Sequence, residues 1–276
     1  MNKITDKVKN FYEEIKFPNY DDDNLTSIIM KGRKNLFIKK IIEEIPSNIQ
    51  IIETGCGTGQ LSNFLSATTN NKIIATDLCE HSIRLAKEFN QKYISSNKID
   101  FINCDIFNNS IKKEISDLTF ALGWMHHTKN CELAFKEVLS LTKKDKYVII
   151  SLYNKIGRFK TTLILYLSKI FGKKIIKYLD PRVKKIKTLE KKNTWIKDQY
   201  FNIHETRHSY NEVEQWCKKY NATILNFFPA SPNGFVLDKI FKKQKKMNFL
   251  EKIFNQILIL IKGDDGGLFF CVIKKN

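Results

Sequence analysis

The stretch Glu53-Thr54-Gly55-Cys56-Gly57-Thr58-Gly59-Gln60-Leu61 follows an apolar run that ends at Ile52. A strand that ends in an acidic residue and breaks into alternate glycines lets the backbone turn sharply and approach a ligand closely. Dinucleotide-binding loops instead have the spacing G-x-G-x-x-G and direct a helix N-terminus at a pyrophosphate. Because Glu53 would repel a diphosphate, the stretch predicts a pocket for a cationic ligand with an amino acid end.

Three later apolar runs also end in polar residues. Asp77 closes the run 73–76 and lies 18 positions beyond Gly59, about the distance needed to cross one helix and return along a parallel strand. Asp105 closes the run 101–104, and the run that begins after Asp117 leads to the residues Gly-Trp-Met-His-His at 123–127. Ligands of doubly wound sheets bind beyond the carboxyl ends of parallel strands, so we expect these positions to surround one site.

With these four positions, the chain resembles the class I S-adenosylmethionine-dependent methyltransferases, of the small-molecule type 11/12-like kind, over residues 49–152. The resemblance implies an α/β fold: a Rossmann-like, doubly wound, seven-stranded sheet that is mostly parallel, with an antiparallel last strand and helical insertions after strands five and six. It also implies that the chain is an enzyme whose cofactor is S-adenosylmethionine.

The resemblance further implies roles for the residues at the strand ends. Asp77 would accept hydrogen bonds from the ribose hydroxyls, Leu78 would pack on the adenine, and Asp105 and the backbone N–H of Ile106 would meet the edge of the adenine ring. The implied cofactor-binding residues are Glu53, Gly55, Cys56, Gly57, Gly59, Asp77, Leu78, Asp105, Ile106 and Gly123.

The acceptor side gives weaker signals. His126 could take a proton from an acceptor, because an unperturbed imidazole titrates near neutrality, or the His pair could be architectural. Residues 204–208 match H-E-x-x-H, but no helical pattern surrounds them and no third ligand is evident, so we predict no metal site. His204 then becomes a second candidate base in a segment that reaches over the acceptor. Further substrate candidates are Trp124, His127, Tyr153, Asn154 and His208.

Four segments organise the chain. We expect an N-terminal helical lid or strap at 1–45, with a helical stretch over 25–44, and a cofactor-binding core at 46–153. A basic helical insertion at 154–208 would form an acceptor lid. Residues 209–276 would complete the core, with a capping box at Ser209 and Glu212, strands at 222–228 and 268–273, and a second basic helical insertion at 233–262.

The net charge of +18 is concentrated in the second half, because residues 1–150 contribute +2 and residues 151–276 contribute +16. Three interpretations stay open: a nucleic-acid surface, an anionic membrane or lipid-like substrate near the amphipathic run 163–174, or ordinary solvated lysines. The chain has neither the Asp/Asn-Pro-Pro-aromatic tetrad nor the Pro-Cys dipeptide of base-modifying DNA enzymes. We therefore predict a small-molecule or lipid-like acceptor. RNA methylation is the alternative, and a catalytically silent binding module is the second alternative.

The six cysteines show no C-x-x-C pair, which is typical of a reduced compartment. The N-terminus lacks the apolar core of a signal peptide, and no apolar run approaches the length of a membrane span. These features predict a cytoplasmic protein.

Overall fold

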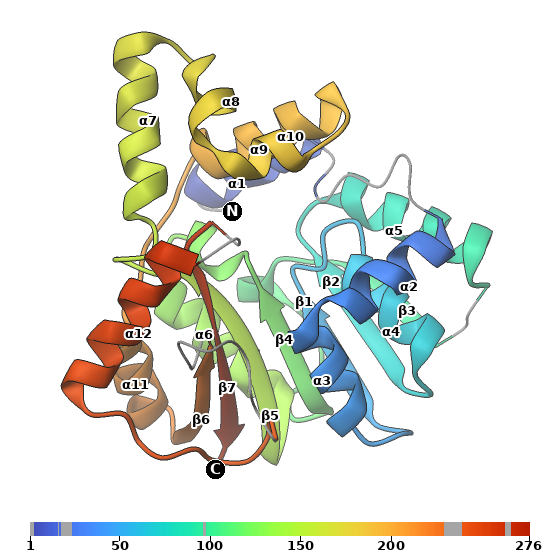
Figure 1. Ribbon diagram of the computed structural model, residues 1–276. Coiled ribbons are helices and arrows are strands. Elements are labelled where there is room, and N and C mark those ends of the chain that lie inside the picture. The colour runs from blue at the N-terminus through green and yellow to red at the C-terminus, as the bar shows by residue number, and fades with distance from the viewer. Residues whose placement is uncertain (1–2, 16, 18–23, 96–97, 229–238, 263–265) are drawn as a thin grey trace.

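The computed structural model describes residues 3–15, 17, 24–95, 98–228, 239–262 and 266–276 (Figure 1). The described residues form a seven-stranded sheet in the order β3-β2-β1-β4-β5-β7-β6, in which β7 runs antiparallel to both of its neighbours. This order confirms the predicted fold class. The strands are β1 (Gln50–Thr54), β2 (Lys72–Asp77), β3 (Ile99–Asn103), β4 (Ser116–Leu122), β5 (Thr142–Tyr153), β6 (Ala222–Phe228) and β7 (Leu268–Lys275).

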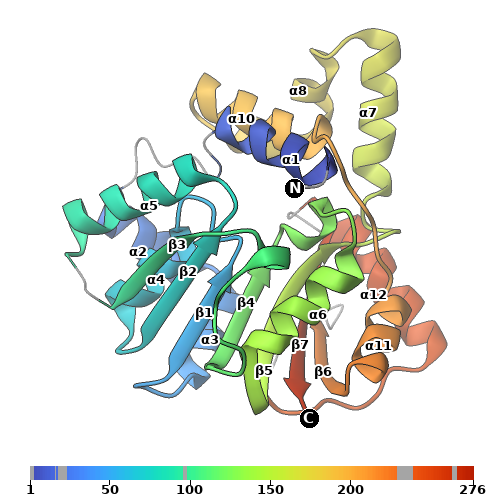
Figure 2. The same ribbon diagram turned by 180° about the vertical axis from the view of Figure 1, so that it is seen from behind.

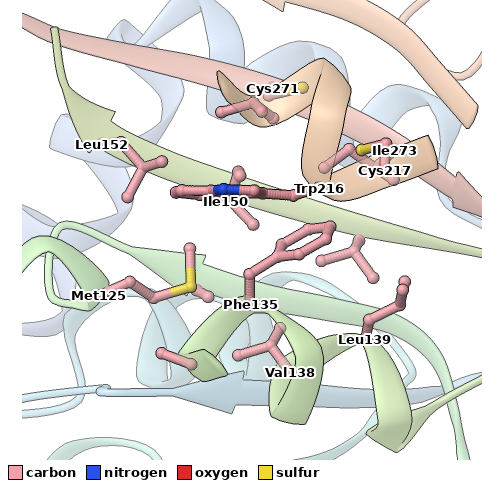
Figure 3. Close-up of a cluster of buried hydrophobic side chains, with 14 of the residues drawn as sticks. Met125, Phe135, Val138, Leu139, Ile150, Leu152, Trp216, Cys217, Cys271 and Ile273 are labelled. Carbon is pink, nitrogen blue, oxygen red and sulfur yellow. The ribbon is translucent and has the colours of Figure 1, made fainter. Parts of the chain in front are cut away.

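Helices cover both faces of the sheet (Figures 1 and 2). Successive residues of a strand point to opposite faces, so the central strands need two apolar residues in a row. Ile149 packs with residues of α2 (Leu25–Lys34), α3 (Leu36–Glu44), α4 (Gln60–Thr68) and α5 (Glu80–Tyr93). Ile150 packs on the other face with Phe135 of α6 (Cys131–Leu141) and Trp216 of α11 (Tyr210–Lys219), as Figure 3 shows.

A group of helices stands beyond the carboxyl ends of the parallel strands. We call α1 (Lys3–Glu13), α7 (Phe159–Phe171), α8 (Ile175–Leu179), α9 (Pro181–Lys185) and α10 (Leu189–Tyr200) the helical roof. Both ribbon views place α1 beside α10, although the two are far apart in sequence (Figures 1 and 2). The insertion has its own small core, which includes Ile164, Ile176, Val183, Ile196 and Tyr200.

Local sequence explains most element boundaries. Ser209 and Glu212 form the expected capping box at the start of α11, and β6 has the expected bounds. The expected helical stretch over 25–44 is divided into two helices, because Asn35 ends α2 and its side chain accepts from the backbone N–H groups of Phe37 and Ile38 at the start of α3. β5 begins five residues before Tyr147, and β7 continues beyond Ile273.

The second expected insertion, at 233–262, includes α12 (Phe249–Lys262), and its first residues, 233–238, lie outside the described part. Of the expected N-terminal strap, residues 1–2, 16 and 18–23 also lie outside it. Within the described ranges, no helix has both the length and the apolar character that crossing a bilayer requires.

Candidate functional site

A cavity of about 310 Å³ lies at the carboxyl ends of β1, β2, β3 and β4, with α1 forming part of its wall. Loops at four strand ends and a helix from the roof therefore share one site. The predicted cofactor residues that line it are Glu53, Gly55, Cys56, Gly57, Asp77, Leu78, Asp105, Ile106 and Gly123. Of the predicted acceptor residues, Trp124 and His127 line it, whereas His126, Tyr153, Asn154, His204 and His208 do not.

The glycine loop turns between β1 and α4 with positive φ angles, 66° at Gly55 and 76° at Gly59. A Cβ atom on Gly55 would overlap the indole ring of Trp124, so this glycine lets a cavity wall pack directly on the loop backbone. Gly59 lies outside the cavity lining. It caps α4, and a Cβ there would stand 2.7 Å from the Cβ of Ala86 on α5.

The loop and the β2 end are joined by the Asp77 carboxylate. One oxygen accepts from the backbone N–H of Gly57 (2.7 Å) and the other from that of Cys79 (2.8 Å). Burial raises the pKa of Asp77 above its ordinary value, although these N–H donors act in the opposite direction. A carboxylate oxygen can accept more than one hydrogen bond, so Asp77 keeps capacity for a ligand hydroxyl in the cavity.

Glu53 is almost completely buried at the end of β1, where the Ser62 hydroxyl of α4 donates to it. Burial raises the pKa of Glu53 to about 7, and the Ser62 hydrogen bond only partly opposes this effect. A buried carboxyl that bonds to no cationic side chain of the described residues is suited to receive a positive charge from a ligand.

Asp105 begins the short helix η1 (Ile106–Asn108), and its Oδ1 accepts from the backbone N–H of Phe107 (3.0 Å). This bond fixes the turn after β3 and places Asp105 and Ile106 in the cavity wall. At the β4 end, Gly123 has a φ of 79° and open space where a Cβ would stand. Both turns therefore contribute to the cavity wall.

The His pair divides into two different environments on η2 (Met125–His127). The ring of His126 is fully buried against the ring of Tyr153, at a centroid separation of 4.0 Å, and neither ring nitrogen has a hydrogen-bond partner among the described residues. Burial lowers its pKa well below the ordinary value. His127 faces the cavity instead, and its Nδ1 lies 2.7 Å from the carbonyl oxygen of His204. Burial lowers the pKa of His127 as well.

Tyr153 and Asn154 bind the insertion to the sheet. The Tyr153 hydroxyl accepts from the Gln199 side chain (2.9 Å), and the Arg158 guanidinium lies over its ring at 3.7 Å. The side-chain oxygen of Asn154 accepts from the backbone of Gly157, and its amide donates to Gln256 of α12. Both side chains therefore have structural partners away from the cavity.

The segment 204–208 is not helical, as its sequence predicted. His208 donates its backbone N–H to the carbonyl of Tyr153, and its Nε2 lies 2.9 Å from the Thr206 hydroxyl. The backbone carbonyl of His204, and not its ring, contacts His127 in the cavity wall. No group of three potential metal-binding side chains occurs in the described ranges.

Sequence reasoning missed two residues that organise the roof. Tyr12 of α1 lines the cavity, donates its hydroxyl proton to Asp198 (2.8 Å) and accepts from Asn202 (2.9 Å). Arg158 is fully buried and bonds to Glu205, Gln199 and the backbone of residue 266. Aromatic residues at 11–20 signalled a strap, but no local pattern distinguishes Arg158 from the many other basic residues.

Comparisons with known proteins agree with this geometry. A family model described as a methyltransferase domain matches residues 45–253. A curated relative, the bifunctional methyltransferase of Rickettsia prowazekii (strain Madrid E), is 24% identical over 147 residues. The match covers 48% of this chain and only 28% of that relative.

Solved structures with the same fold have low sequence identity to this chain. Magnesium protoporphyrin IX methyltransferase from Synechocystis PCC 6803, with bound S-adenosylmethionine, superposes with a TM-score of 0.57 at 10% identity, covering 100% of this chain and 99% of the other. PKMT2 from Rickettsia typhi, in complex with S-adenosylhomocysteine, gives 0.59 at 11% identity over 83% and 49%. A Haloferax volcanii putative methyltransferase complexed with the Trm112 activator gives 0.54 at 9% identity over 99% and 98%.

The family model covers well over half of the chain, and the strand order and the glycine loop are those that the resemblance implies. The chain therefore belongs to the methyltransferase-domain family.

Proposed function

We propose that the protein transfers the methyl group of S-adenosylmethionine to a small-molecule nucleophile that binds between η2 and α1. The supporting observation is that one histidine, His127, stands in the cavity wall with its ring orientation fixed. Tyr12 faces it from the roof, with ring centroids 6.3 Å apart. The acceptor would therefore lie near a base, beneath a helix that separates it from water.

The chemistry of the cavity fits the donor. Glu53 would receive the ammonium group, Asp77 the ribose hydroxyls, and Asp105 with Ile106 the adenine edge. Three carboxylates and mainly apolar neighbours suit a ligand that carries positive charge and no phosphate. When bound, the donor supplies a methyl group on a sulfonium that is a good leaving group. The protein then has to align the nucleophile and exclude water.

His127 is suited to accept a proton from the nucleophile. A carbonyl oxygen can only accept a hydrogen bond, so the 2.7 Å contact with His204 requires the proton of the neutral ring to be on Nδ1. Nε2 then carries the free lone pair. Because the pKa of His127 is below its ordinary value, the ring is neutral at physiological pH and ready to act as a base. This geometry favours His127 over His126, the base expected from sequence.

A His127→Asn variant tests this assignment. Methyl transfer is measured with labelled donor on a pool of small metabolites and, separately, on total RNA. We expect turnover on small molecules to fall about 100-fold or more, because a positioned base contributes at least this factor. Calorimetric binding of S-adenosylhomocysteine should stay within about twofold, because Asn keeps the size and polarity of the site.

His81→Asn on α5 is the matched control, since His81 lies outside the cavity lining. It should leave turnover unchanged. Full turnover by His127→Asn would exclude His127 as the base. Labelling confined to RNA would replace the small-molecule acceptor by the nucleic-acid alternative.

A further inference from the structure

The roof leaves one apolar face of α7 in water. On one side of this helix, Ile164 packs into the small core of the insertion. On the other side, Phe159, Leu163, Tyr166 and Ile170 are between 48% and 62% exposed. Their spacing of three and four residues places them in one stripe along the helix. A helix that is apolar on two sides normally has a second partner.

The stripe continues into the junction of α7 and α8, which both ribbon views place at the end of α7 farthest from the sheet (Figures 1 and 2). Phe171, at the end of α7, is 67% exposed, and Tyr178, in α8, is 73% exposed. We call residues 159–179 the α7–α8 surface. Its two most exposed aromatic rings therefore belong to the end of α7 and to α8.

Positive charge surrounds this apolar stripe. Residues 159–179 contain five lysines and no acidic residue. The next acid, Asp180, is buried and pairs with Arg182 at 2.7 Å, so it does not neutralise the lysines at the surface. All five lysines are exposed, and none forms an ion pair with a described residue. They are Lys160, Lys169, Lys173, Lys174 and Lys177.

We propose that the α7–α8 surface docks on an anionic lipid membrane, with the apolar stripe in the interface and the lysines at the headgroups. Exposed apolar and aromatic side chains on a helix flanked by lysines are typical of segments that lie in a bilayer interface. Each lysine near an anionic bilayer contributes favourable energy that salt screens. This surface is independent of the acceptor proposed above, because it lies outside the cavity lining.

Charge and side-chain type argue against two other partners. A second copy of the chain would bring two groups of five lysines together, and like charges repel across an interface. RNA would satisfy the lysines and could stack on the exposed aromatic rings, but it would leave the exposed aliphatic side chains of Leu163 and Ile170 without an apolar partner. A bilayer satisfies both the charge and the aliphatic residues.

Vesicle sedimentation tests the proposal with the full chain. Vesicles are made of phosphatidylcholine alone or of phosphatidylcholine mixed with phosphatidylglycerol. We expect the protein to sediment with the mixed vesicles, and the variant Lys174→Gln/Lys177→Gln to bind them about 30-fold more weakly. Ile170→Gln/Phe171→Gln should also bind more weakly, and its residual binding should vanish at raised salt because only the lysines remain.

The matched control is Lys87→Gln/Lys112→Gln, two exposed lysines elsewhere on the molecule, which should bind as the unchanged protein does. Circular dichroism and S-adenosylhomocysteine affinity verify that each variant is folded. The proposal is overturned if both lysine variants bind equally, or if Ile170→Gln/Phe171→Gln binds as well as the unchanged protein. It is also overturned if the protein does not sediment with vesicles but retards the migration of RNA in a gel. A dimer that the Ile170→Gln/Phe171→Gln substitutions dissociate would overturn it as well.

Discussion

The floor of the cavity, formed by the loops at the carboxyl ends of β1, β2, β3 and β4, differs from the helical roof in how its residues are held in place. At the floor, Asp77 and Asp105 bind backbone N–H groups of their own or adjacent turns. In the roof, Tyr12 bonds to Asp198, which is 186 positions away in the sequence. Arg158 forms hydrogen bonds with both Glu205 and Gln199. A site whose parts are fixed by backbone geometry tolerates changes elsewhere in the chain. A roof assembled by side chains depends on each of them.

The comparison predicts that one substitution in the roof has the largest effect on stability. Arg158→Met removes every hydrogen bond of a fully buried guanidinium and leaves the half-buried Glu205 carboxylate without its closest partner. Breaking a buried pair from one side costs about 3–5 kcal/mol. Urea denaturation should therefore show a loss of this size in the free energy of unfolding.

Lys155→Met is the control for this variant. Lys155 lies three residues earlier and pairs with Glu212 at 2.7 Å, but its side chain is mostly exposed, so its loss should cost less than about 1 kcal/mol. Equal effects of the two substitutions would mean that burial of Arg158 does not distinguish the roof from the surface.

The contribution of the floor to stability should appear as a pH dependence of the free energy of unfolding. Burial raises the pKa of Glu53 from 4.5 to about 7, so the folded chain keeps a proton that the unfolded chain releases between these values. The unfolded state then binds fewer protons, and stability falls as pH rises through this window, by about 3 kcal/mol in total. Glu53→Gln should remove this fall when unfolding is measured between pH 5 and pH 8.

The control for the pH experiment is Glu43→Gln on α3, because that carboxyl is exposed and, among the described residues, pairs only with lysines of its own helix. Its pH dependence should match that of the unchanged protein. A Glu53→Gln variant with the same slope would show that the buried carboxyl is not the source of the effect.

Sequence predicted the floor because its information is local. A glycine loop, an acid at the ends of β1, β2 and β3 and the helix-length spacing between them are local signals, and Glu53, Asp77 and Asp105 line one cavity at the sheet edge. The break between α2 and α3 also had a local signal, since Asn35 precedes the residues that it caps.

The roof had no comparable signal. Nothing near Tyr12 indicates Asp198, and a buried Arg158 looks the same in sequence as the exposed lysines around it. The two histidines at 126–127 show the same limit, because adjacent residues of one short helix face different surroundings. Which ring faces the cavity depends on the position of residue 204, far along the chain.

The smallest expected effect concerns two glycines with positive φ, one in the floor and one in the roof. Gly55 lies in the floor and Gly172 in the roof, with φ values of 66° and 84°, so alanine is strained at both. Only at Gly55 does the added Cβ meet a side chain, the indole of the cavity residue Trp124. Gly55→Ala should therefore weaken calorimetric binding of S-adenosylhomocysteine about 10-fold, the equivalent of about 1.4 kcal/mol. Gly172→Ala should lower stability but leave this affinity unchanged, and equal affinity losses would mean that roof and floor are coupled through the backbone.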